Sequence, residues 1–338
     1  MKESASTGKG RVFEYFVLDV FTRTQLQGNP LAVVLNHGAL TTETMQAIAK
    51  EMNLSETTFV ERRSAEVERD GGVRVRIFTP QEELPFAGHP TLGTASVIRA
   101  IAPECVASVN GQDIVTLDLN VGAIPVRFDP RPEGTAMWPM AGEMTQRDPE
   151  FGELLDSAEV AALTGLHIDD FDPAFPIQVV STGTAFAIVP VRSASALAGL
   201  RVRQEEACAF LQARGARWFY VLGPEAQNGP SQPTSTLPVW RARMQFNGGE
   251  DPATGSAAGC AISYLVRHGA VPPDQTIHLR QGVEIARPSD LFLTASLDLY
   301  AAGKLAREPL QTAHLGKVTQ VRVGGSTILV AKGELFLP

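Results

Sequence analysis

The chain contains two copies of one segment, and this internal repeat restricts the possible folds more than any other feature. Residues 73–95 read VRVRIFTPQEELPFAGHPTLGTA, and residues 240–262 read WRARMQFNGGEDPATGSAAGCAI. A shift of 167 positions (255 − 88) places Gly88 on Gly255 without a gap. The same shift aligns Arg74 with Arg241, Arg76 with Arg243, Glu83 with Glu250 and Pro85 with Pro252. Because the shift is close to half of the 338 residues, it predicts two similar lobes that face each other across a cleft.

Each copy of the repeat has the same order of local features. An apolar, strand-like run is followed by an acidic turn, and a glycine-bearing turn then opens a helix rich in small residues. A ligand in the predicted cleft would therefore meet two helix N-termini. Their unpaired N–H groups and positive dipole ends favour an anion.

Composition narrows the class of protein. With 44% hydrophobic and 20% charged residues, the chain is an ordinary globular protein with room for two domains. The formal net charge of −8 argues against nucleic acid or an anionic membrane as partner. Three widely spaced cysteines (Cys105, Cys208 and Cys260) indicate reduced thiols rather than a disulfide framework.

The ends of the chain and its apolar runs bear on where the protein works. Residues 1–10 are polar and are expected to form a disordered arm without the apolar stretch of a signal peptide. No run reaches the roughly 20 apolar residues that a membrane helix needs. We therefore expect a cytoplasmic protein without membrane partners.

The first half reads as alternating strands and helices. Apolar runs predict strands over 12–20, 31–35, 57–60 and 73–78, with further strands between 114 and 128. Helices are predicted from a cap at Thr41 or Thr42 to about residue 52, and over 90–100. The Pro- and Gly-rich stretch 129–142 is the predicted passage and hinge between the lobes, with an edge strand at 138–140.

The second half repeats this order. Gly183 followed by Ala187 matches Gly28 followed by Ala32 at a shift of 155, so the copies differ by an insertion. Helices are predicted over 159–164, 194–213 and 256–268, and residues 223–237 are predicted to be a mobile loop insertion. Strands are predicted over 218–222 and 239–246, on both sides of the Gly183 turn within 177–191, and as two strands in the tail 320–337.

These elements give an α/β (α+β) fold of two pseudo-symmetric lobes. We expect an N-terminal lobe over 11–130 and a C-terminal lobe over 143–323. A C-terminal strand, about 324–338, is expected to return to the first lobe.

Several kinds of chemistry lack sequence support. The six histidines have no metal-ligand spacing, and there is neither a phosphate-binding loop nor a dinucleotide fingerprint. The residues around Ser256 do not form a nucleophile elbow. We therefore expect no metal and no cofactor, which leaves proton transfer by side chains.

Four side chains at the repeated turns and one loop fit that task. Glu56 lies at a helix-to-strand junction, and His89 follows Gly88 at the start of a helix. Asp251 and Ser256 flank the second glycine turn. Taken singly, Glu56 is a solvated charge, and Asp251 and Ser256 are helix caps. His89 alone fits a structural hydrogen-bond donor as well as it fits a catalytic group. The repeat changes this interpretation, because it brings both turns to one cleft where Gly88 and Gly255 offer N–H groups to a single carboxylate.

The chain resembles the phenazine-biosynthesis (PhzF-like) isomerases at five ordered motifs from about Phe13 to Leu337. The motifs are Asp19-Val20-Phe21-Thr22 with Gly28-Asn29-Pro30-Leu31-Ala32-Val33, Asn53-Leu54-Ser55-Glu56-Thr57, Phe86-Ala87-Gly88-His89-Pro90-Thr91, Glu250-Asp251-Pro252-Ala253-Thr254-Gly255-Ser256-Ala257, and Gln281-Gly282 with Arg287-Pro288-Ser289. The resemblance implies the diaminopimelate-epimerase fold, in which each lobe wraps a curved sheet around a central helix. It also implies isomerisation of the trans-2,3-dihydro-3-hydroxyanthranilate type, with no cofactor, and a homodimer. By motif position the acid/base glutamate is Glu56, and the supporting polar residues are His89, Asp251 and Ser256.

One departure from the wider superfamily bears on mechanism. The two-cysteine racemases and epimerases of this fold carry a thiol just before each turn glycine, and here those positions hold Ala87 and Thr254. Cys260 lies about one helical turn beyond Ser256, where we expect it to pack. A thiol pair is therefore absent from the turns, and a single carboxylate that moves a proton along the substrate is the better hypothesis.

The sequence thus predicts a small carboxylate-bearing substrate held at Gly88, Gly255 and Ser256, with Glu56 as acid/base and His89 and Asp251 orienting it. One alternative is a non-thiol epimerase or racemase that pairs Glu56 with Asp251 or His89. A second is a catalytically silent binding protein of the same fold. A hydrolase with a Ser256–His89–Asp triad is the least favoured alternative, because the nucleophile elbow is absent. Because the predicted site is divided between lobes, we expect an open form without ligand and a closed form with one.

Overall fold

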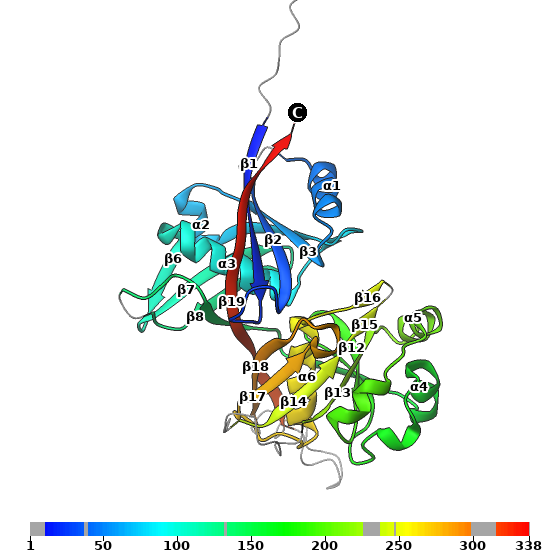
Figure 1. The fold of residues 1–338 in the computed structure, drawn as a ribbon. Coiled ribbons are helices and arrows are strands. Elements are labelled where there is room, and N and C mark those ends of the chain that lie inside the picture. The colour runs from blue at the N-terminus through cyan, green and yellow to red at the C-terminus, as the bar shows by residue number, and fades with distance from the viewer. Residues whose placement is uncertain are drawn as a thin grey trace, which may run out of the picture.

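The computed structural model describes residues 11–36, 40–131, 134–225, 237–246, 248–298 and 316–337. The predicted arm (1–10) and most of the predicted loop insertion (226–236) lie outside these ranges. Figure 1 shows two bodies, one above the other, with the long final strand β19 running through both. The predicted fold class is confirmed: this is a mixed α/β protein whose strands and helices form two similar lobes.

The upper body in Figure 1 is built mainly from the first part of the chain. Its strands are β1 (Arg11–Val20), β2 (Asn29–Asn36), β3 (Glu56–Glu61), β4 (Val73–Phe78), β5 (Glu83–Leu84), β6 (Val106–Val109), β7 (Gln112–Leu119), β8 (Gly122–Phe128) and β9 (Met140–Thr145). Its helices are α1 (Thr42–Met52), α2 (Ala65–Gly71) and α3 (Gly88–Ile101).

The lower body holds the second part of the chain. Its strands are β10 (Glu150–Leu154), β11 (Gln178–Ser181), β12 (Ala185–Pro190), β13 (Trp218–Pro224), β14 (Val239–Arg243), β15 (Gln245–Phe246), β16 (Gly249–Glu250), β17 (Ile277–Gln281) and β18 (Ser289–Asp298), followed by β19 (Lys317–Leu337). Its helices are α4 (Ser157–Thr164), α5 (Gln204–Gln212) and α6 (Gly255–Arg267).

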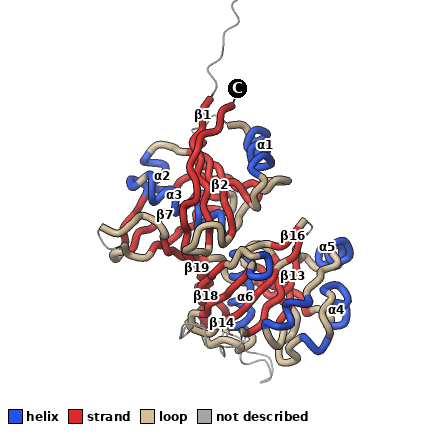
Figure 2. Tube along the Cα trace, viewed as in Figure 1, coloured by secondary structure: helices blue, strands red, loops and turns tan. Residues whose placement is uncertain are grey.

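A single buried helix occupies the centre of each body, as Figure 2 shows for α3 and α6. Every residue of α3 from 88 to 98 is buried, and so is every residue of α6 from 257 to 266. Helices that are apolar on all sides must be enclosed, because no face of them suits water. The strands therefore wrap around α3 and α6, and each helix N-terminus points out of its own lobe toward the other.

The order of strands is the same in both bodies. β2 pairs with β3 in parallel, and β3 pairs with β4 antiparallel. In the same way β12 pairs with β13 in parallel, and β13 pairs with β14 antiparallel. The topology therefore repeats along with the sequence.

The aligned Arg and Glu residues of the repeat form the same contact twice. Arg76 and Glu83 make a bidentate pair with Nε–Oε1 and Nη2–Oε2 distances of 2.8 and 2.6 Å. Arg243 and Glu250 make the same pair at 2.8 and 2.6 Å. Bidentate Arg–carboxylate pairs fix geometry as well as charge. Each pair therefore holds the acidic turn that leads to the buried helix.

Strand β19 connects the bodies by pairing with strands of both. Residues 317–324 pair with β18, residues 322–327 with β9, and residues 327–337 with β1. The prediction of two strands in the tail is therefore wrong in number. The tail is one 21-residue strand, because Gly324 and Gly325, which could form a turn, instead pair with β18 and β9.

Two other predicted elements differ from the structure. The predicted helix over 194–213 is broken into a short 3₁₀ helix (Ala194–Gly199) and α5. Between them the N–H groups of Arg201 and Arg203 donate to carbonyls at the end of α4, which stops the helical ladder. The edge strand predicted at 138–140 begins only at Met140 and continues to Thr145 as β9.

The predicted cap of the first helix is confirmed. Thr41 caps α1 through its side chain, which accepts from the Thr44 N–H at 3.3 Å. Across the part of the chain that the structure describes, no helix is long and apolar enough to cross a membrane.

Candidate active site

The two glycine turns of the repeat meet where the lobes face each other. A Cβ atom added to Gly88 would lie 2.8 Å from Gly255 Cα and 3.0 Å from the Ser256 nitrogen. A Cβ on Gly255 would lie 3.2 Å from Gly88 Cα. Such distances leave no room for a side chain on Gly88, so glycine at this turn permits the close approach of two backbones.

The helix N-termini at this meeting point carry no side-chain cap. Among the described residues, neither Ala87 before α3 nor Thr254 before α6 provides a side-chain hydrogen bond to its helix. By contrast, α1 and α4 are capped by Thr41 and Asp156. Uncapped N–H groups need another partner. The two central helices therefore present donors and positive dipole ends to the same place.

Glu56 and His89 lie together beside this point. Glu56 is the first residue of β3 and His89 the second residue of α3. Glu56 Oε2 lies 3.3 Å from His89 Nε2, and the two side chains are 15% and 5% exposed. Both atoms are buried, and neither has a well-aligned hydrogen-bond partner among the described residues. Unsatisfied buried polar atoms are rare in proteins and indicate a place where a ligand supplies the missing partner.

Burial determines the protonation of this pair. Loss of solvation raises the pKa of Glu56 to about 8, and the negative charge of Asp251 adds to the rise while Arg217 opposes it. Burial also lowers the pKa of His89 to about 3. At neutral pH the imidazole is therefore uncharged, and the Glu56 carboxyl is mostly protonated but loses its proton about one pH unit higher.

Asp251 reaches the same site from the second lobe. Its Oδ1 accepts from Asn29 Nδ2 at 2.8 Å, and its Oδ2 accepts from the Thr254 hydroxyl at 2.7 Å. Burial raises the pKa of Asp251 to about 6, although these hydrogen bonds act in the opposite direction. Asp251 is thus a second buried carboxyl, held in place by neighbours from both lobes.

Asn29 links the predicted residues and was not predicted as a site residue. Its side-chain nitrogen donates to Asp251 and to the Ala253 carbonyl, both at 2.8 Å, and lies 3.2 Å from His89 Nδ1. Its own Oδ1 is buried without a partner among the described residues. The available signal was its place in Gly28-Asn29-Pro30, which indicates a turn and belongs to the first of the five family motifs, but which assigns no role to the Asn29 side chain.

Gln281 is a second residue that sequence reasoning missed. Its Nε2 donates to the Asp251 carbonyl and to Thr254 Oγ1, and its Oε1 accepts from the Thr254 N–H and the Tyr220 hydroxyl. Gln281 therefore uses its amide donors and acceptor to fix Asp251 and Thr254, which precede the second turn glycine.

Ser256 lies in the first turn of α6 and is partly exposed. The neighbouring Gly255 carbonyl accepts from Gln146 Nε2 at 2.8 Å, which ties α6 to the segment that follows β9. The structure thus brings Glu56, Gly88 and His89 of one lobe to Asp251, Gly255 and Ser256 of the other. Cys260 is buried in α6, as expected of a packing residue.

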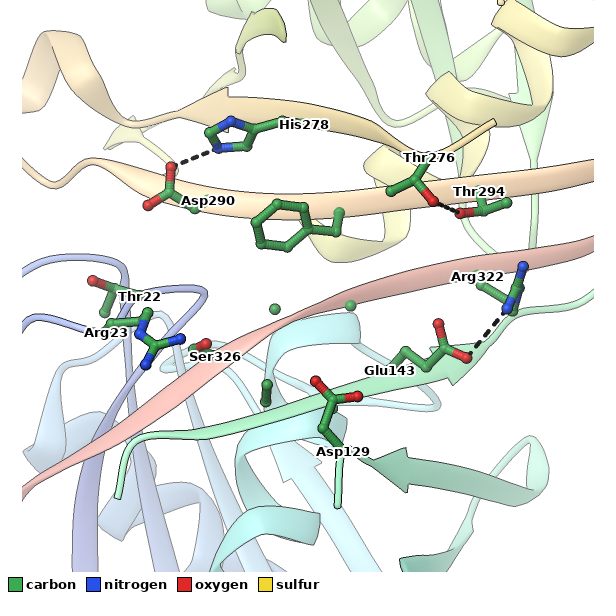
Figure 3. Close-up of a pocket in the computed structure, with 15 residues that line it drawn as sticks. Thr22, Arg23, Asp129, Glu143, Thr276, His278, Asp290, Thr294, Arg322 and Ser326 are labelled. Atoms are coloured by element: carbon green, nitrogen blue, oxygen red, sulfur yellow. Dashed lines mark hydrogen bonds and ion pairs between the residues drawn. The ribbon is translucent and has the colours of Figure 1, made fainter. Parts of the chain in front are cut away.

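A separate cavity of about 510 Å³ contains none of these residues. Figure 3 shows it beside β19, with the His278–Asp290 and Arg322–Glu143 pairs on its walls. These pairs, 2.7 and 3.5 Å long, join four of the six ionisable side chains that line it. The cavity offers space but no unsatisfied buried group among the described residues, so we place the chemistry at Glu56.

Comparison with known proteins agrees with this geometry. A model of the family described as "Phenazine biosynthesis-like protein" matches residues 18–333. The trans-2,3-dihydro-3-hydroxyanthranilate isomerase of Pseudomonas aeruginosa is 35% identical over 326 residues, covering 96% of this chain and 99% of the relative.

Solved structures share the fold. A PhzF-family phenazine biosynthesis protein from Bacillus anthracis superimposes with a TM-score of 0.75 at 23% identity, covering 96% of this chain and 99% of the other. A hydroxyproline epimerase from Agrobacterium vitis superimposes with a TM-score of 0.58 at 11% identity, covering 97% and 93%. At these identities the two structures establish the architecture alone.

Proposed function

Because this chain belongs to the phenazine biosynthesis-like protein family, we propose that it is an isomerase that moves a proton within a small carboxylate-bearing metabolite, with Glu56 as the acid/base group. The observation that carries this proposal is the state of Glu56. Its carboxyl is buried at the meeting point of the lobes, its Oε2 lacks a well-aligned partner among the described residues, and its pKa is raised to about 8.

The substrate carboxylate is assigned to the two uncapped helix N-termini. Backbone N–H groups at Gly88 and Gly255 would donate to it, together with the Ser256 hydroxyl. Donors that are fixed before the reaction stabilise negative charge as it develops, and they do so most strongly in a site without water. Charge stabilised at the carboxylate increases the acidity of the adjacent C–H bond. The substrate is thereby prepared for proton removal.

Glu56 performs the transfer in two steps. The carboxylate takes a proton from the substrate carbon, and the resulting carboxylic acid returns it to another carbon of the conjugated system, so that the double bond moves. A raised pKa makes Glu56 a stronger base than an ordinary glutamate while leaving it able to donate near neutral pH. Neutral His89 and the Asn29–Asp251 pair orient the substrate.

The class of substrate follows from the relative with which the chain shares 35% identity. That relative is named for trans-2,3-dihydro-3-hydroxyanthranilate, a conjugated ring carboxylate. We propose a substrate of this chemical class and use the named compound as the probe.

A non-thiol epimerase is the second candidate, and one observation favours it. Asp251 is a buried carboxyl with a pKa of about 6 on the lobe opposite Glu56. Two acid/base groups on two lobes are what inversion of a carbon centre requires. The thiol positions hold Ala87 and Thr254, so any such epimerase would depend on these carboxyls.

The test follows the probe by NMR in D₂O with the wild type, Glu56→Gln and Glu51→Gln, which changes an exposed carboxylate nearby. We expect a moved double bond with the wild type and with Glu51→Gln. In Glu56→Gln we expect a rate at least about 100-fold lower, the usual size of a general acid–base contribution. An inverted centre with deuterium incorporated and the double bond in place would support the epimerase instead. Near-normal turnover by Glu56→Gln would remove the proposed role.

A further inference from the structure

The register of the strands identifies the residue that stands opposite Glu56 in the second lobe. In the first lobe Glu56 pairs with Leu31 of β2. The shift of 155 that aligns Gly28 with Gly183 places Leu31 on Phe186 (31 + 155), and Phe186 pairs with Trp218 of β13. Trp218 is therefore the counterpart of Glu56.

A second, independent register leads to the same residue. The shift of 167 aligns Arg76 with Arg243. Arg76 pairs with Phe59, and Arg243 pairs with Val221. Residue 59 thus corresponds to residue 221, a shift of 162, and 56 + 162 is again 218. Because both registers agree, Trp218 occupies in the second lobe the place that Glu56 occupies in the first.

Trp218 is fixed by aromatic and cationic neighbours. Its ring stacks on Phe186 with centroids 6.0 Å apart, and Phe186 belongs to the buried core that includes α6. The Arg217 guanidinium lies over the Trp218 ring, 4.3 Å from its centroid. A stacked guanidinium loses less freedom when it then forms an ion pair.

From this anchored position Arg217 reaches the other lobe. Its Nη2 lies 2.6 Å from Oε1 of Glu82, which precedes β5 in the acidic turn of the first repeat copy. Both side chains are about half exposed, at 43% and 54%. Arg217 is also close enough to Glu56 for its charge to oppose the rise in the Glu56 pKa. The ion pair therefore crosses between the lobes next to the predicted site.

We propose that Arg217 and Glu82 are positioning residues whose ion pair, anchored on Trp218, holds the two lobes closed around the substrate. An exposed ion pair contributes little to folding. It affects lobe closure nevertheless, because the closed arrangement contains the contact and separated lobes lose it. This inference rests on the proposed function for the location of the substrate.

The experiment measures closure directly, with benzoate as a stable ring carboxylate. Small-angle X-ray scattering is recorded during a benzoate titration for the wild type, Arg217→Gln, Glu82→Gln and the double variant. Each single variant should need roughly two- to fivefold more benzoate to reach half closure, the range that an exposed pair spans. The double variant should need no more benzoate for half closure than the single variant with the higher midpoint, because the two residues act through one contact.

A matched control is Lys317→Gln, which breaks another exposed ion pair of 2.6 Å, with Asp148. We expect its midpoint to equal that of the wild type. In turnover of the probe, Arg217→Gln and Glu82→Gln should raise KM by a similar factor with little change in kcat. In addition, only Arg217→Gln should move the pH inflection of kcat/KM upward, since it removes a positive charge near Glu56.

Three results would overturn the proposal. One is a benzoate midpoint unchanged in both single variants. Another is an effect of Arg217→Gln with none from Glu82→Gln, which would assign Arg217 to contact with the substrate. The third is a wild type whose scattering does not change with benzoate. Failure of the proposed function would appear elsewhere, as normal turnover in Glu56→Gln, and it would leave the scattering comparison intact.

Discussion

Replacing Glu56 by Gln should make the protein more stable at alkaline pH while it lowers turnover at least about 100-fold. Burial raises the pKa of Glu56 from 4.5 to about 8, so the folded protein retains this proton while the unfolded chain releases it near pH 4.5. Each pH unit between these two pKa values therefore lowers the free energy of unfolding by about 1.4 kcal/mol. Over the full shift the loss is of the order of 5 kcal/mol, and it is constant above pH 8. A glutamine side chain at this position cannot ionise, so the variant escapes this loss.

The assay is urea unfolding of wild type and Glu56→Gln at pH 5, 6, 7 and 8. The difference in unfolding free energy should grow in favour of the variant by about 1.4 kcal/mol per pH unit, to roughly 4 kcal/mol between pH 5 and 8. Glu51→Gln, on the exposed surface, is the control and should show no such growth. A difference that stays constant within about 1 kcal/mol over this range would refute the buried, proton-retaining state of Glu56.

Three further predictions concern the cleft. Because the base form of Glu56 is needed and its pKa in the free protein is about 8, kcat/KM should rise with pH to an inflection near 8 and then level off; a pH profile of kcat/KM that is flat from 6 to 9 would contradict this. Gly88→Ala should lower kcat/KM at least about tenfold, because its Cβ would meet the Gly255 backbone at 2.8 Å. Gly71→Ala is the control and should leave kcat/KM unchanged, because its Cβ would have nothing within 4 Å. Equal kinetics of the two variants would show that the glycine turns do not approach each other in the active form. Crystals with and without a bound carboxylate should differ by rigid rotation of the lobes, and identical orientations, with unchanged solution scattering, would mean that the cleft is preformed.

Much of the fold was readable because the repeat imposes the same local chemistry twice. Arg76 and Glu83 were aligned with Arg243 and Glu250 by position alone, and both pairs form the same bidentate contact. The buried helices were predictable from runs of small and apolar residues. The break near residue 200 was not, because it depends on hydrogen bonds from Arg201 and Arg203 to a helix distant in sequence.

The ionisable residues of the candidate site could be predicted because they lie in sequence motifs. Residues whose place depends on the register of strand pairing could not be predicted. Glu56 and His89 belong to different motifs, and the fold brings Glu56 Oε2 to 3.3 Å from His89 Nε2. Asn29 and Gln281 also stand in these motifs, but they act through uncharged amide groups next to a turn glycine, so the sequence did not mark them as site residues. Trp218 could be matched with Glu56 only after strand pairing was known, because the two copies differ by an insertion.

The most direct test of the account is a crystal structure of Glu56→Gln with trans-2,3-dihydro-3-hydroxyanthranilate bound. We expect the ligand carboxylate within about 3 Å of backbone nitrogens at the Gly88 and Gly255 turns, and the substituted side chain at position 56 facing a ring carbon. A carboxylate bound instead in the cavity beside Arg23 and Arg322, or at the cleft with the position 56 side chain directed away from the ring, would contradict the central claim that Glu56 moves the proton.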